Sequence, residues 1–423
     1  MSKFEYRPRL IEKELEGYLN AFGAVLIVGP KWCGKTTTAK RYAKSILDLH
    51  DEDKLEGYML IAKEKISLLL KGKKPRLIDE WQIIPRIWDA VRYEVDRNNE
   101  NGSFILAGSV TVDNDAIKHS GAGRIARLKM GTMSLYEQGI SSGEVSLTDL
   151  LKGAENISGT SELDYSGLAE AVVHGGWPES VGKTKDQVRR HMAGYCKAIT
   201  ETDISAVDGK QRDSVKAESI LRSLSRGLSA PVNNSAVEAD TSDRSDMSMH
   251  RNTVSDYIRA LERIYVIDDL PAWNPNLRSK TAIRATATRH FADPAIAAHF
   301  LNASSEDLEK DPATFGLLFE SMAIRDIRAY AQAFGGSVYH YRDSDGLEAD
   351  AIVRTNDGKW GAMEIKLGSR YIDDAAKNLK KLRGKIDTER EHAPSFLAVI
   401  TGTEHAYRRD DGVFVIPLGC LRN

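Results

Sequence analysis

The chain has 423 residues, of which 41% are hydrophobic, 28% charged and 7% aromatic. This length suits two or three domains with cores of their own, and the composition argues against disordered, collagenous and coiled-coil classes. With 59 Lys and Arg against 61 Asp and Glu, the net charge is −2, so nucleic-acid binding would have to come from local basic patches.

Three cysteines, Cys33, Cys196 and Cys420, lie far apart in the sequence and form no CxxC pair. This spacing indicates neither a disulfide framework nor a zinc site, and it favours a reducing compartment. The charged start MSKFEYRPRL differs from a signal peptide, and no apolar run approaches the about 18 residues of a membrane span. We therefore expect a cytoplasmic protein with no membrane contact.

The first region, residues 1–165, alternates short apolar runs with helical patterns. The runs 24–28, 76–78 and 104–107 predict buried strands, and the pattern at 37–46 predicts a helix. Such alternation is typical of an α/β domain with a parallel sheet and flanking helices.

A glycine-rich motif follows the first predicted strand. Residues 29–36 read GPKWCGKT and fit GxxxxGK[ST] without a mismatch, between a strand and a helix as the motif requires. Its backbone N–H groups can wrap a phosphate, Lys35 can neutralise the β- and γ-phosphates, and Thr36 can offer its hydroxyl to Mg²⁺. The motif predicts binding of ATP and Mg²⁺ by Gly29, Pro30, Lys31, Trp32, Cys33, Gly34, Lys35, Thr36 and Thr37.

The run PRLIDE at 75–80 supplies the carboxylates that a hydrolysing enzyme of this kind needs. Asp79 would hold Mg²⁺ through water, and Glu80 would activate the attacking water. Ser109 follows the third predicted strand and is placed to sense the γ-phosphate. Arg124 is a candidate arginine finger for a neighbouring subunit's nucleotide, and an ordinary surface arginine is the alternative.

These motifs together resemble a known family. GPKWCGKTT, LIDEWQ, FILAGS, the GR at 123–124 and the later SLYEQG are similar to those of AAA+ ATPases of bacteria and archaea that carry a C-terminal domain of uncharacterised function. GGWPE at 175–179 and the segment 251–294 extend the resemblance over nearly the whole chain. The resemblance implies an AAA+ ATPase and, because such motors usually act as rings, a homo-oligomer.

Residues 166–300 are mostly helical in pattern. Helices are predicted over 214–225 and 250–263, the polar stretch 231–246 between them is a loop or a weak helix, and 265–288 is long enough for a β-wing. This order predicts a helical lid and winged-helix-like segment that binds DNA, although a helix with merely solvated arginines, or one packed between domains, is the alternative. The phosphate-contacting residues would be Arg251, Arg259 and Arg263.

Residues 301–423 predict a compact α/β domain of a long helix, a three-strand meander, a second helix and further strands. Strand alternation places Asp350 on the same side as Glu364 and Lys366. With Glu320 on the preceding helix, the set resembles the PD-(D/E)xK nuclease core. That resemblance implies that Glu320, Asp350 and Glu364 bind Mg²⁺ and that Lys366 orients water or stabilises negative charge. An inert scaffold of the same shape is the alternative.

The helix predicted over 371–385 is basic, and Lys377, Lys381 and Lys385 fall on one stripe of it. Such a stripe can follow a DNA backbone, although charge runs are commonly just solvated faces.

The combined features predict an ATP-dependent DNA-processing enzyme, a motor or remodeller of the translocase or helicase type, with branched DNA as one candidate substrate. A Mg²⁺-dependent, nuclease-like domain would be coupled to it. The alternative is a nucleotide-dependent switch whose C-terminal domain is an inert DNA- or protein-binding scaffold. DNA-stimulated ATP hydrolysis distinguishes the two.

Overall fold

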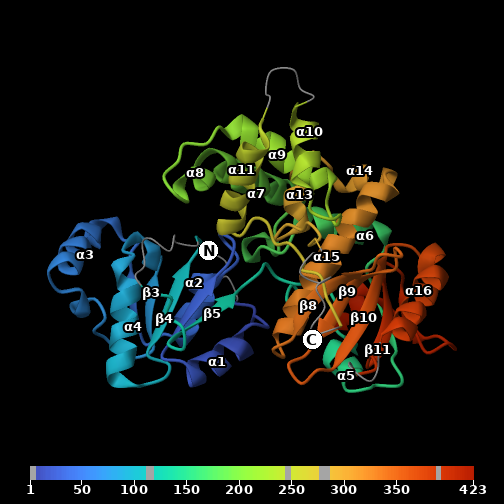
Figure 1. Cartoon of the computed structure of the whole chain (residues 1–423), viewed down its shortest axis with the longest axis horizontal. Helices are drawn as coiled ribbons and strands as arrows, with labels where there is room; N and C mark the ends of the chain where they lie inside the picture. Colours follow the sequence, from blue (N-terminus) through green and yellow to red (C-terminus); the bar gives the residue numbers. More distant parts are fainter. Residues whose placement is uncertain (1–5, 111–118, 243–248, 276–285, 387–391) are drawn as a thin grey trace.

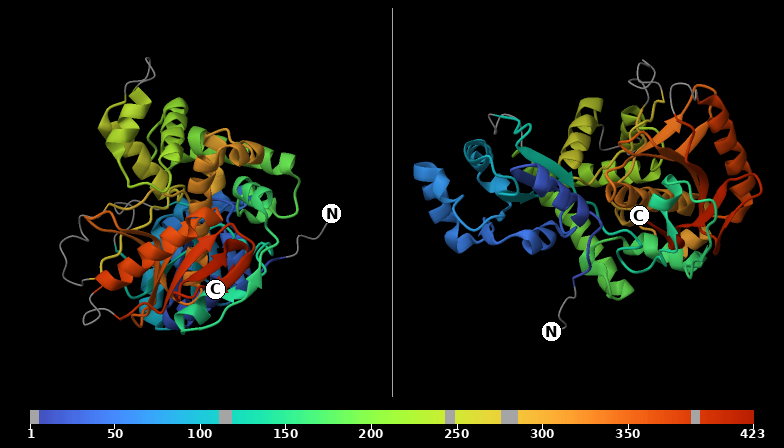
Figure 2. Two further views of the ribbon diagram at one scale, coloured as in Figure 1. Left: turned by 90° about the vertical axis from the view of Figure 1, so that its right-hand side faces the viewer. Right: turned by 90° about the horizontal axis from the view of Figure 1, so that it is seen from below.

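The computed structural model describes residues 6–110, 119–242, 249–275, 286–386 and 392–423. A parallel sheet and a mixed sheet lie on opposite sides of the molecule, with a group of helices above and between them (Figure 1), and the view from below in Figure 2 shows the same separation. No helix in these described ranges combines the length and apolar character that crossing a membrane requires.

The parallel sheet contains five strands in the order β2-β3-β4-β1-β5. Helices α1 and α2 pack on one face, and α3 and α4 pack on the other. Every residue of the central strands β1 and β4 is buried, as expected for apolar runs covered on both faces. The predicted α/β class with a parallel sheet is confirmed. The elements are α1 (Glu12–Ala21), β1 (Ala24–Val28), α2 (Lys35–Tyr42), β2 (Ser45–Asp48), α3 (Glu52–Lys65), β3 (Arg76–Asp79), α4 (Arg86–Asn98), β4 (Phe104–Gly108) and β5 (Ile125–Lys129).

The helix predicted over 37–46 is wrong at its end. Helix α2 stops at Tyr42, and residues 45–48 form the edge strand β2. The backbone N–H of Lys44 donates to the oxygen of Pro75, and β2 then pairs in parallel with β3. Pairing with β3 therefore overrides the local helical pattern.

The middle region is built of helices, and its polar stretch is helical over 234–242, with residues 243–246 outside the described ranges. After the last of its three consecutive helices α9, α10 and α11, the chain pairs antiparallel at Ile267 with Phe291 and at Leu270 with Thr288. Pro231, between the first two helices, also pairs with Thr288. Residues 276–285 of the predicted wing lie outside the described ranges. The elements are α6 (Tyr165–His174), α7 (Lys185–Ala198), η5 (Ile199–Asp203), α8 (Ile204–Ala206), α9 (Ser214–Arg226), α10 (Asn234–Ser242), α11 (Arg251–Arg263), α13 (Pro294–Phe300) and α14 (Ser305–Lys310).

The mixed sheet has seven strands in the order β7-β12-β13-β11-β10-β9-β8. Its strands β8, β9 and β10 form the predicted antiparallel meander, with α15 against one face and α16 against the other. The C-terminal elements are α15 (Pro312–Gln332), β8 (Ser337–Arg342), β9 (Glu348–Arg354), β10 (Trp360–Lys366), α16 (Ile372–Lys385), β11 (Phe396–Thr401), β12 (His405–Arg408), β13 (Phe414–Pro417) and β14 (Leu421–Arg422).

The segment after the parallel sheet contributes to the C-terminal half. Strand β7 (Gly159–Thr160) pairs with β12, and β6 (Val145–Ser146), just before α5 (Leu147–Leu151), pairs with β14. One continuous buried core runs from Leu135 through the middle helices to Leu421. The division into 1–165, 166–300 and 301–423 stays a prediction, since this core crosses both of its boundaries.

Candidate nucleotide site and C-terminal carboxylate cluster

The loop over 29–34 joins the carboxyl end of β1 to the start of α2. Gly34 has a left-handed backbone with φ of 102°, which glycine adopts without strain, and it leads directly into Lys35. Lys35 is buried, and its Nζ donates to the backbone oxygens of Gly29 at 2.9 Å and Pro30 at 2.8 Å. A phosphate in this loop would meet the ammonium group and the N-terminal N–H groups of α2.

The predicted magnesium residues are brought together from different elements. The hydroxyl of Thr36 donates to Asp79 Oδ1 at 2.9 Å. Burial raises the pKa of Asp79, and the hydrogen bond from Thr36 opposes that shift. Glu80 follows directly, in the left-handed backbone region with φ of 53°, and its carboxylate accepts from the side-chain amide of Gln82. A hydroxyl beside a buried carboxylate is a donor set that suits hydrated Mg²⁺.

Ser109 lies at the carboxyl ends of the parallel strands, and Arg124 lies at their amino ends. Ser109 is buried just after β4, which pairs in parallel with β1 and β3, so it lies at the edge that carries the loop and Asp79. Arg124 precedes β5 at the amino ends of the strands, where its Nε lies 2.6 Å from Asp96 Oδ1. Arg124 therefore lies away from the phosphate loop of its own chain.

The side chains of Lys31 and Trp32 face the middle region. Lys31 Nζ lies 2.7 Å from Asp203 Oδ1, and the indole N–H of Trp177 donates to the Lys31 backbone oxygen at 3.2 Å. The Trp32 ring lies 5.7 Å from that of Tyr195, measured between centroids. Only the backbone of these two predicted ligand-binding residues therefore faces the loop interior. Their side chains contact the middle helices.

In the C-terminal half, a lysine lies between two carboxylates. Lys366 Nζ on β10 is 2.7 Å from Glu364 Oε2 and 3.1 Å from Asp350 Oδ2 on β9. Asp350 also accepts from the backbone N–H of Ile365 at 2.7 Å. These three charged side chains line a cavity of about 230 Å³, together with Glu348 and residues of the α16 side.

The carboxylates of this cluster influence one another. Burial, with the charge of Asp350, raises the pKa of Glu364 to about 7, and Lys366 opposes the shift. Burial and then Asp350 raise the pKa of Glu320 well above its ordinary value. The four predicted residues therefore come together. Within the described ranges, however, no group of three or more His, Cys, Asp or Glu side chains is arranged to hold a metal ion.

Comparisons with known proteins bear on each region. Residues 21–138 match the model of the AAA domain family. The N-terminal region is an AAA-type P-loop NTPase domain. Two further models match, each described as a domain of unknown function: DUF8612 over residues 165–307 and DUF4143 over residues 315–421. A search of curated proteins found no match.

Two solved structures are similar to this chain at low identity and low TM-score. A Walker-type ATPase of Pyrococcus abyssi is 14% identical, with a TM-score of 0.42, 71% of this chain covered and 99% of that chain. The ORC1 protein of Aeropyrum pernix, solved in complex with DNA, is 13% identical, with a TM-score of 0.27, 71% of this chain covered and 92% of that chain.

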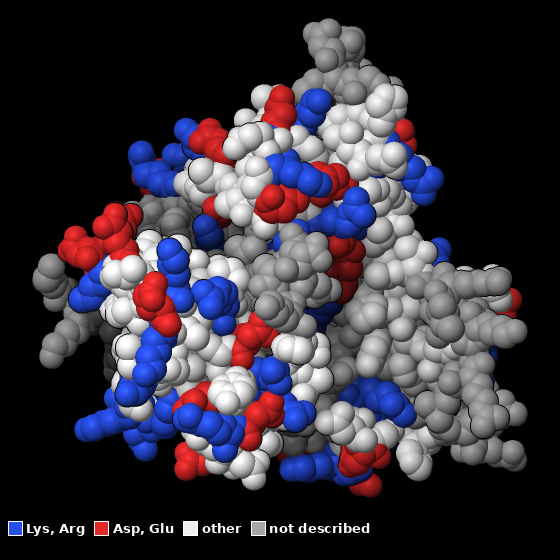
Figure 3. Space-filling view, turned by 60° about the vertical axis from the view of Figure 1, so that its left-hand side comes forward, with Lys and Arg blue, Asp and Glu red and all other residues white. Residues whose placement is uncertain are grey.

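The basic residues predicted on α11 differ in their surroundings. Arg251 and Arg259 are exposed, whereas Arg263 is partly buried and donates to the backbone oxygen of Val207 at 3.2 Å. The buried side of α11 is its predicted apolar stripe. Over the described residues of the face in Figure 3, positive and negative side chains are intermixed, so phosphate contacts would be local.

The stripe on α16 is partly engaged in ion pairs. Lys385 Nζ lies 2.8 Å from Asp343 and 2.6 Å from Asp345, so it holds the β8–β9 turn. Lys377 lies 3.3 Å from Asp374, and Lys381 is exposed. Of the three predicted residues, Lys385 is therefore the one whose charge is most fully engaged by carboxylates.

Two residues near the P-loop were missed by sequence reasoning. Arg9 donates to the backbone oxygen of Cys33 within the loop, and its Nε is 2.9 Å from Glu137 Oε1. Glu137 belongs to the SLYEQG motif, which supports the family resemblance but had been given no structural or catalytic role. The sequence around Arg9 contains no motif that would identify it.

Proposed function

We propose that the P-loop domain hydrolyses ATP with Mg²⁺ and that the protein uses this reaction to process DNA. The observation that carries the proposal is the contact between Thr36 and Asp79 beside the loop that encloses Lys35. In P-loop enzymes such a set holds a metal–nucleotide complex, and catalysis is mostly positioning and charge stabilisation.

The residues fit ATP and Mg²⁺. Thr36 and Asp79 are the residues that would hold Mg²⁺, which when bound neutralises phosphate charge. Lys35 contacts the β- and γ-phosphates, and Ser109 at the neighbouring strand end senses the γ-phosphate. Glu80 takes the proton of the attacking water after its carboxylate leaves the amide of Gln82.

The middle region is the proposed DNA-binding part. Helices α9, α10 and α11 followed by an antiparallel pair have the order of a winged-helix module, and the bridge of Pro231 to Thr288 agrees with that order. The exposed Arg251 and Arg259 support phosphate contact rather than base reading. Lys377 and Lys381 are a second basic surface beside the carboxylate cluster.

The C-terminal cluster supports two candidate roles. A nuclease role rests on Asp350, Glu364 and Lys366, which line one cavity, and on Glu320, whose pKa is influenced by the charges of all three. The alternative, a nucleotide-dependent switch with an inert scaffold, is favoured by Lys366, which already neutralises two carboxylates that a metal ion would need.

We further infer a cytoplasmic homo-oligomer in which the P-loop domains form a ring. Arg124 lies at the sheet edge opposite its own phosphate loop, which supports action on a neighbouring subunit's nucleotide. A ring is the arrangement in which one subunit's arginine reaches the next subunit's site in a repeating way.

The test measures ATP hydrolysis by the purified protein with Mg²⁺ and labelled single-stranded, duplex or branched DNA. We expect hydrolysis that DNA stimulates, and with a live C-terminal site, cleavage of at least one substrate. Stimulation without cleavage supports the DNA motor with an inert C-terminal domain. Hydrolysis that no DNA changes supports the switch, and absence of hydrolysis contradicts the proposal.

A further inference from the structure

Arg9 lies beneath the P-loop and ties it to the segment after β5. Its Nη1 donates to the backbone oxygen of Cys33 at 2.7 Å, and its Nη2 donates to the oxygens of Gly131 at 3.0 Å and Thr132 at 3.1 Å. Its Nε donates to Glu137 Oε1 at 2.9 Å. All three guanidinium nitrogens are thus engaged, and the side chain is 5% exposed.

Glu137 holds Arg9 in place. Its carboxylate also accepts from the backbone N–H of Leu10 at 2.9 Å and of Ser134 at 2.8 Å. Burial alone raises the pKa of Glu137, but Arg9 and these N–H groups together hold it below its ordinary value. The ion pair is therefore charged and fully hydrogen-bonded, as a buried pair has to be.

The P-loop rests on the same segment. A Cβ on Gly29 would lie 2.0 Å from the backbone oxygen of Met130, and the N–H of Met130 donates to Val28 at 2.7 Å. Since Arg9 bonds to Cys33 on the loop and to the two residues after Met130, it fixes the distance between them.

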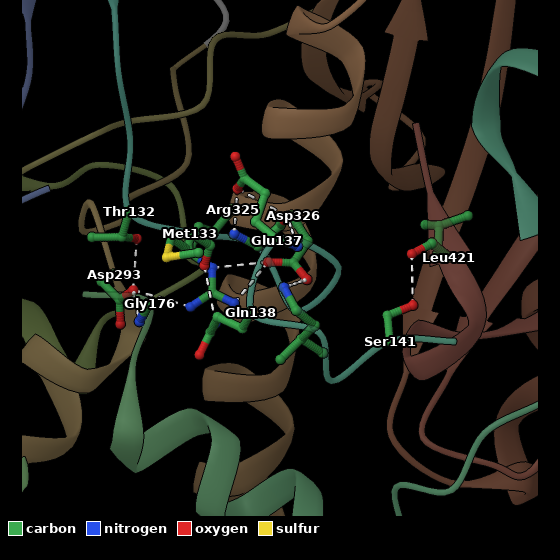
Figure 4. Close-up of polar contacts among 12 residues, drawn as sticks. Thr132, Met133, Glu137, Gln138, Ser141, Gly176, Asp293, Arg325, Asp326 and Leu421 are labelled. Carbon is green, nitrogen blue, oxygen red and sulfur yellow. Dashed lines mark hydrogen bonds and ion pairs between the residues drawn. The ribbon is translucent and has the colours of Figure 1, made fainter. Parts of the chain in front are cut away.

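From this segment, polar contacts lead to α15. The Thr132 hydroxyl donates to Asp293 Oδ2 at 2.7 Å, and Arg325 Nη1 donates to the same oxygen at 3.0 Å. Arg325 also pairs with Asp326, which accepts from the backbone N–H of Leu135 at 2.9 Å. Figure 4 shows Glu137, Arg325 and Asp326 close together, with Thr132 and Asp293 beside them.

We propose that Arg9 is a positioning residue for the P-loop and that the segment 131–137 passes the loop's position to α15. The proposal goes beyond nucleotide binding, and it rests on the proposed function only for the identity of the nucleotide. Helix α15 also carries Glu320 of the carboxylate cluster. The two candidate sites are thereby joined through packed, hydrogen-bonded groups rather than by proximity alone.

The contacts of Arg9 require a guanidinium group, because its three nitrogens donate in different directions. An Arg9→Lys variant keeps the charge but offers one nitrogen in place of three, so it cannot hold Cys33, Glu137 and the 131–132 oxygens at once. Loss of a hydrogen bond that involves a charged group corresponds to about tenfold in an equilibrium constant. We expect the KM for ATP and the Kd for Mg²⁺–ADP each to rise about tenfold in Arg9→Lys.

Arg212→Lys is the matched control. Arg212 has 3% side-chain exposure, pairs with Asp208 and Asp256 and donates to the Ile204 oxygen, but none of these partners belongs to the P-loop or to 131–137. Thermal unfolding of both variants measures the structural cost. The proposal is supported if the two variants lose a similar amount of Tm while only Arg9→Lys has a raised Kd for ADP.

Asp326→Asn tests the connection to α15. Because Asp326 connects the segment 131–137 to α15, this variant, remote from the nucleotide, is expected to raise the ADP Kd about threefold. In the wild type, ADP is expected to slow hydrogen exchange of α15 amides, and this protection should be lost in Arg9→Lys at saturating ADP. Protection that persists in Arg9→Lys would overturn the role of the segment.

Two binding results contradict the role of Arg9, and a third result contradicts only the proposed function. Equal ADP affinity in wild type and Arg9→Lys removes the positioning role of Arg9. An equal rise of the ADP Kd in Arg212→Lys makes the effect one of general stability. A wild-type protein that binds Mg²⁺–ADP without hydrolysing ATP contradicts the proposed function alone, because the ADP measurements still decide the role of Arg9.

Discussion

The P-loop site and the C-terminal cluster use the same residue types in different pairings. In the P-loop domain, Lys35 donates to backbone oxygens, while Asp79 accepts from a threonine hydroxyl, so the two charges remain apart. In the C-terminal cluster, Lys366 lies directly between Glu364 and Asp350. One site keeps its charges for a ligand, and the other neutralises them internally.

This difference predicts opposite responses to ligands and to removal of the lysine. A metal–nucleotide complex finds the P-loop lysine bound only by neutral carbonyl groups, which it can replace with phosphate oxygens. A divalent ion at the C-terminal cluster has to compete with an ammonium group already in place. The lysine should therefore support ligand binding in the first site and the fold itself in the second.

The largest expected effect is on ATP hydrolysis. Lys35→Ala removes the charge that faces the phosphates, so nucleotide binding should be lost. Glu80→Gln removes only the proton acceptor, so ATP should still bind while hydrolysis falls by a factor of about 10³. Binding of a fluorescent ATP analogue and the rate of phosphate release measure the two effects separately. Wild-type hydrolysis by Glu80→Gln would show that Glu80 is not the base.

The second prediction concerns the lysine of the other site. Lys366→Met leaves Asp350 and Glu364 close together without their cation, so without divalent ions the protein should lose about 3 kcal/mol of unfolding free energy. If the carboxylates bind a metal, Mg²⁺ or Ca²⁺ should recover part of that loss. Urea unfolding with EDTA or with the divalent ion gives the measurement.

Lys359→Met is the control for that prediction, because Lys359 is an exposed lysine whose ion pair with Asp357 is 3.8 Å long. Its removal should cost less than about 0.5 kcal/mol. A Lys366→Met protein as stable as Lys359→Met would contradict the structural role of Lys366, whereas a loss of stability that divalent ions do not restore would support the inert scaffold.

Much of the fold could be predicted from the sequence because its signals are local. The strands at 24–28, 76–78 and 104–107 are apolar runs, and the structure has β1, β3 and β4 there. The meander and the long helix before it follow from period-2 and period-3.6 patterns. The GxxxxGK[ST] motif likewise fixes its own loop and helix, so Lys35 and Thr36 could be assigned from spacing alone.

The parts that the sequence did not reveal depend on long-range contacts. Strand β2 forms because β3 offers it a partner, and β5 contains the charged residues Arg127 and Lys129, which weaken an apolar signal. Arg9 acts through residues more than a hundred positions away, and no local pattern encodes that distance. The position of Lys366 between Asp350 and Glu364 depends on how side chains of two neighbouring strands point toward one another. Periodicity predicts only that these three residues lie on the same side of the sheet.

The third prediction is a change in the salt dependence of DNA binding. Replacing both Arg251 and Arg259 by Ala should reduce the slope of log K against log salt by about two units on duplex DNA. The matched control is Arg189→Ala with Arg190→Ala, two exposed arginines on α7. A slope that falls equally in the control would remove the special role of α11.

The same titration also compares the two basic surfaces. If Lys377→Ala with Lys381→Ala changes the slope and the α11 pair does not, DNA lies along the C-terminal cluster instead of the middle region. Arg263→Ala should change the slope less than Arg251→Ala, since its guanidinium already donates to the Val207 oxygen.

The smallest expected effect is a pH-dependent difference in stability at the C-terminal cluster. Burial raises the pKa of Glu364 from 4.5 to about 7, so the fold retains a proton that the unfolded chain releases. Stability from this group is therefore present below pH 4.5 and is lost as the pH rises toward 7. Glu364→Gln has no proton to lose across this window. With EDTA, its free energy of unfolding should therefore exceed that of the wild type by about 1 kcal/mol or more at the upper end of the window.

Glu348→Gln is the control for the pH series, because Glu348 is an exposed neighbour that pairs with Arg342 at 3.1 Å. Because the charge of Glu348 raises the pKa of Glu364 less than burial and Asp350 do, the stability of Glu348→Gln should follow that of the wild type closely from pH 5 to 8. Added Mg²⁺ then separates the two roles of the cluster. If the carboxylates bind the ion, Mg²⁺ stabilises the wild type above pH 7 and reverses the advantage of Glu364→Gln, whereas an advantage unchanged by Mg²⁺ means that Lys366 remains the only cation these carboxylates hold.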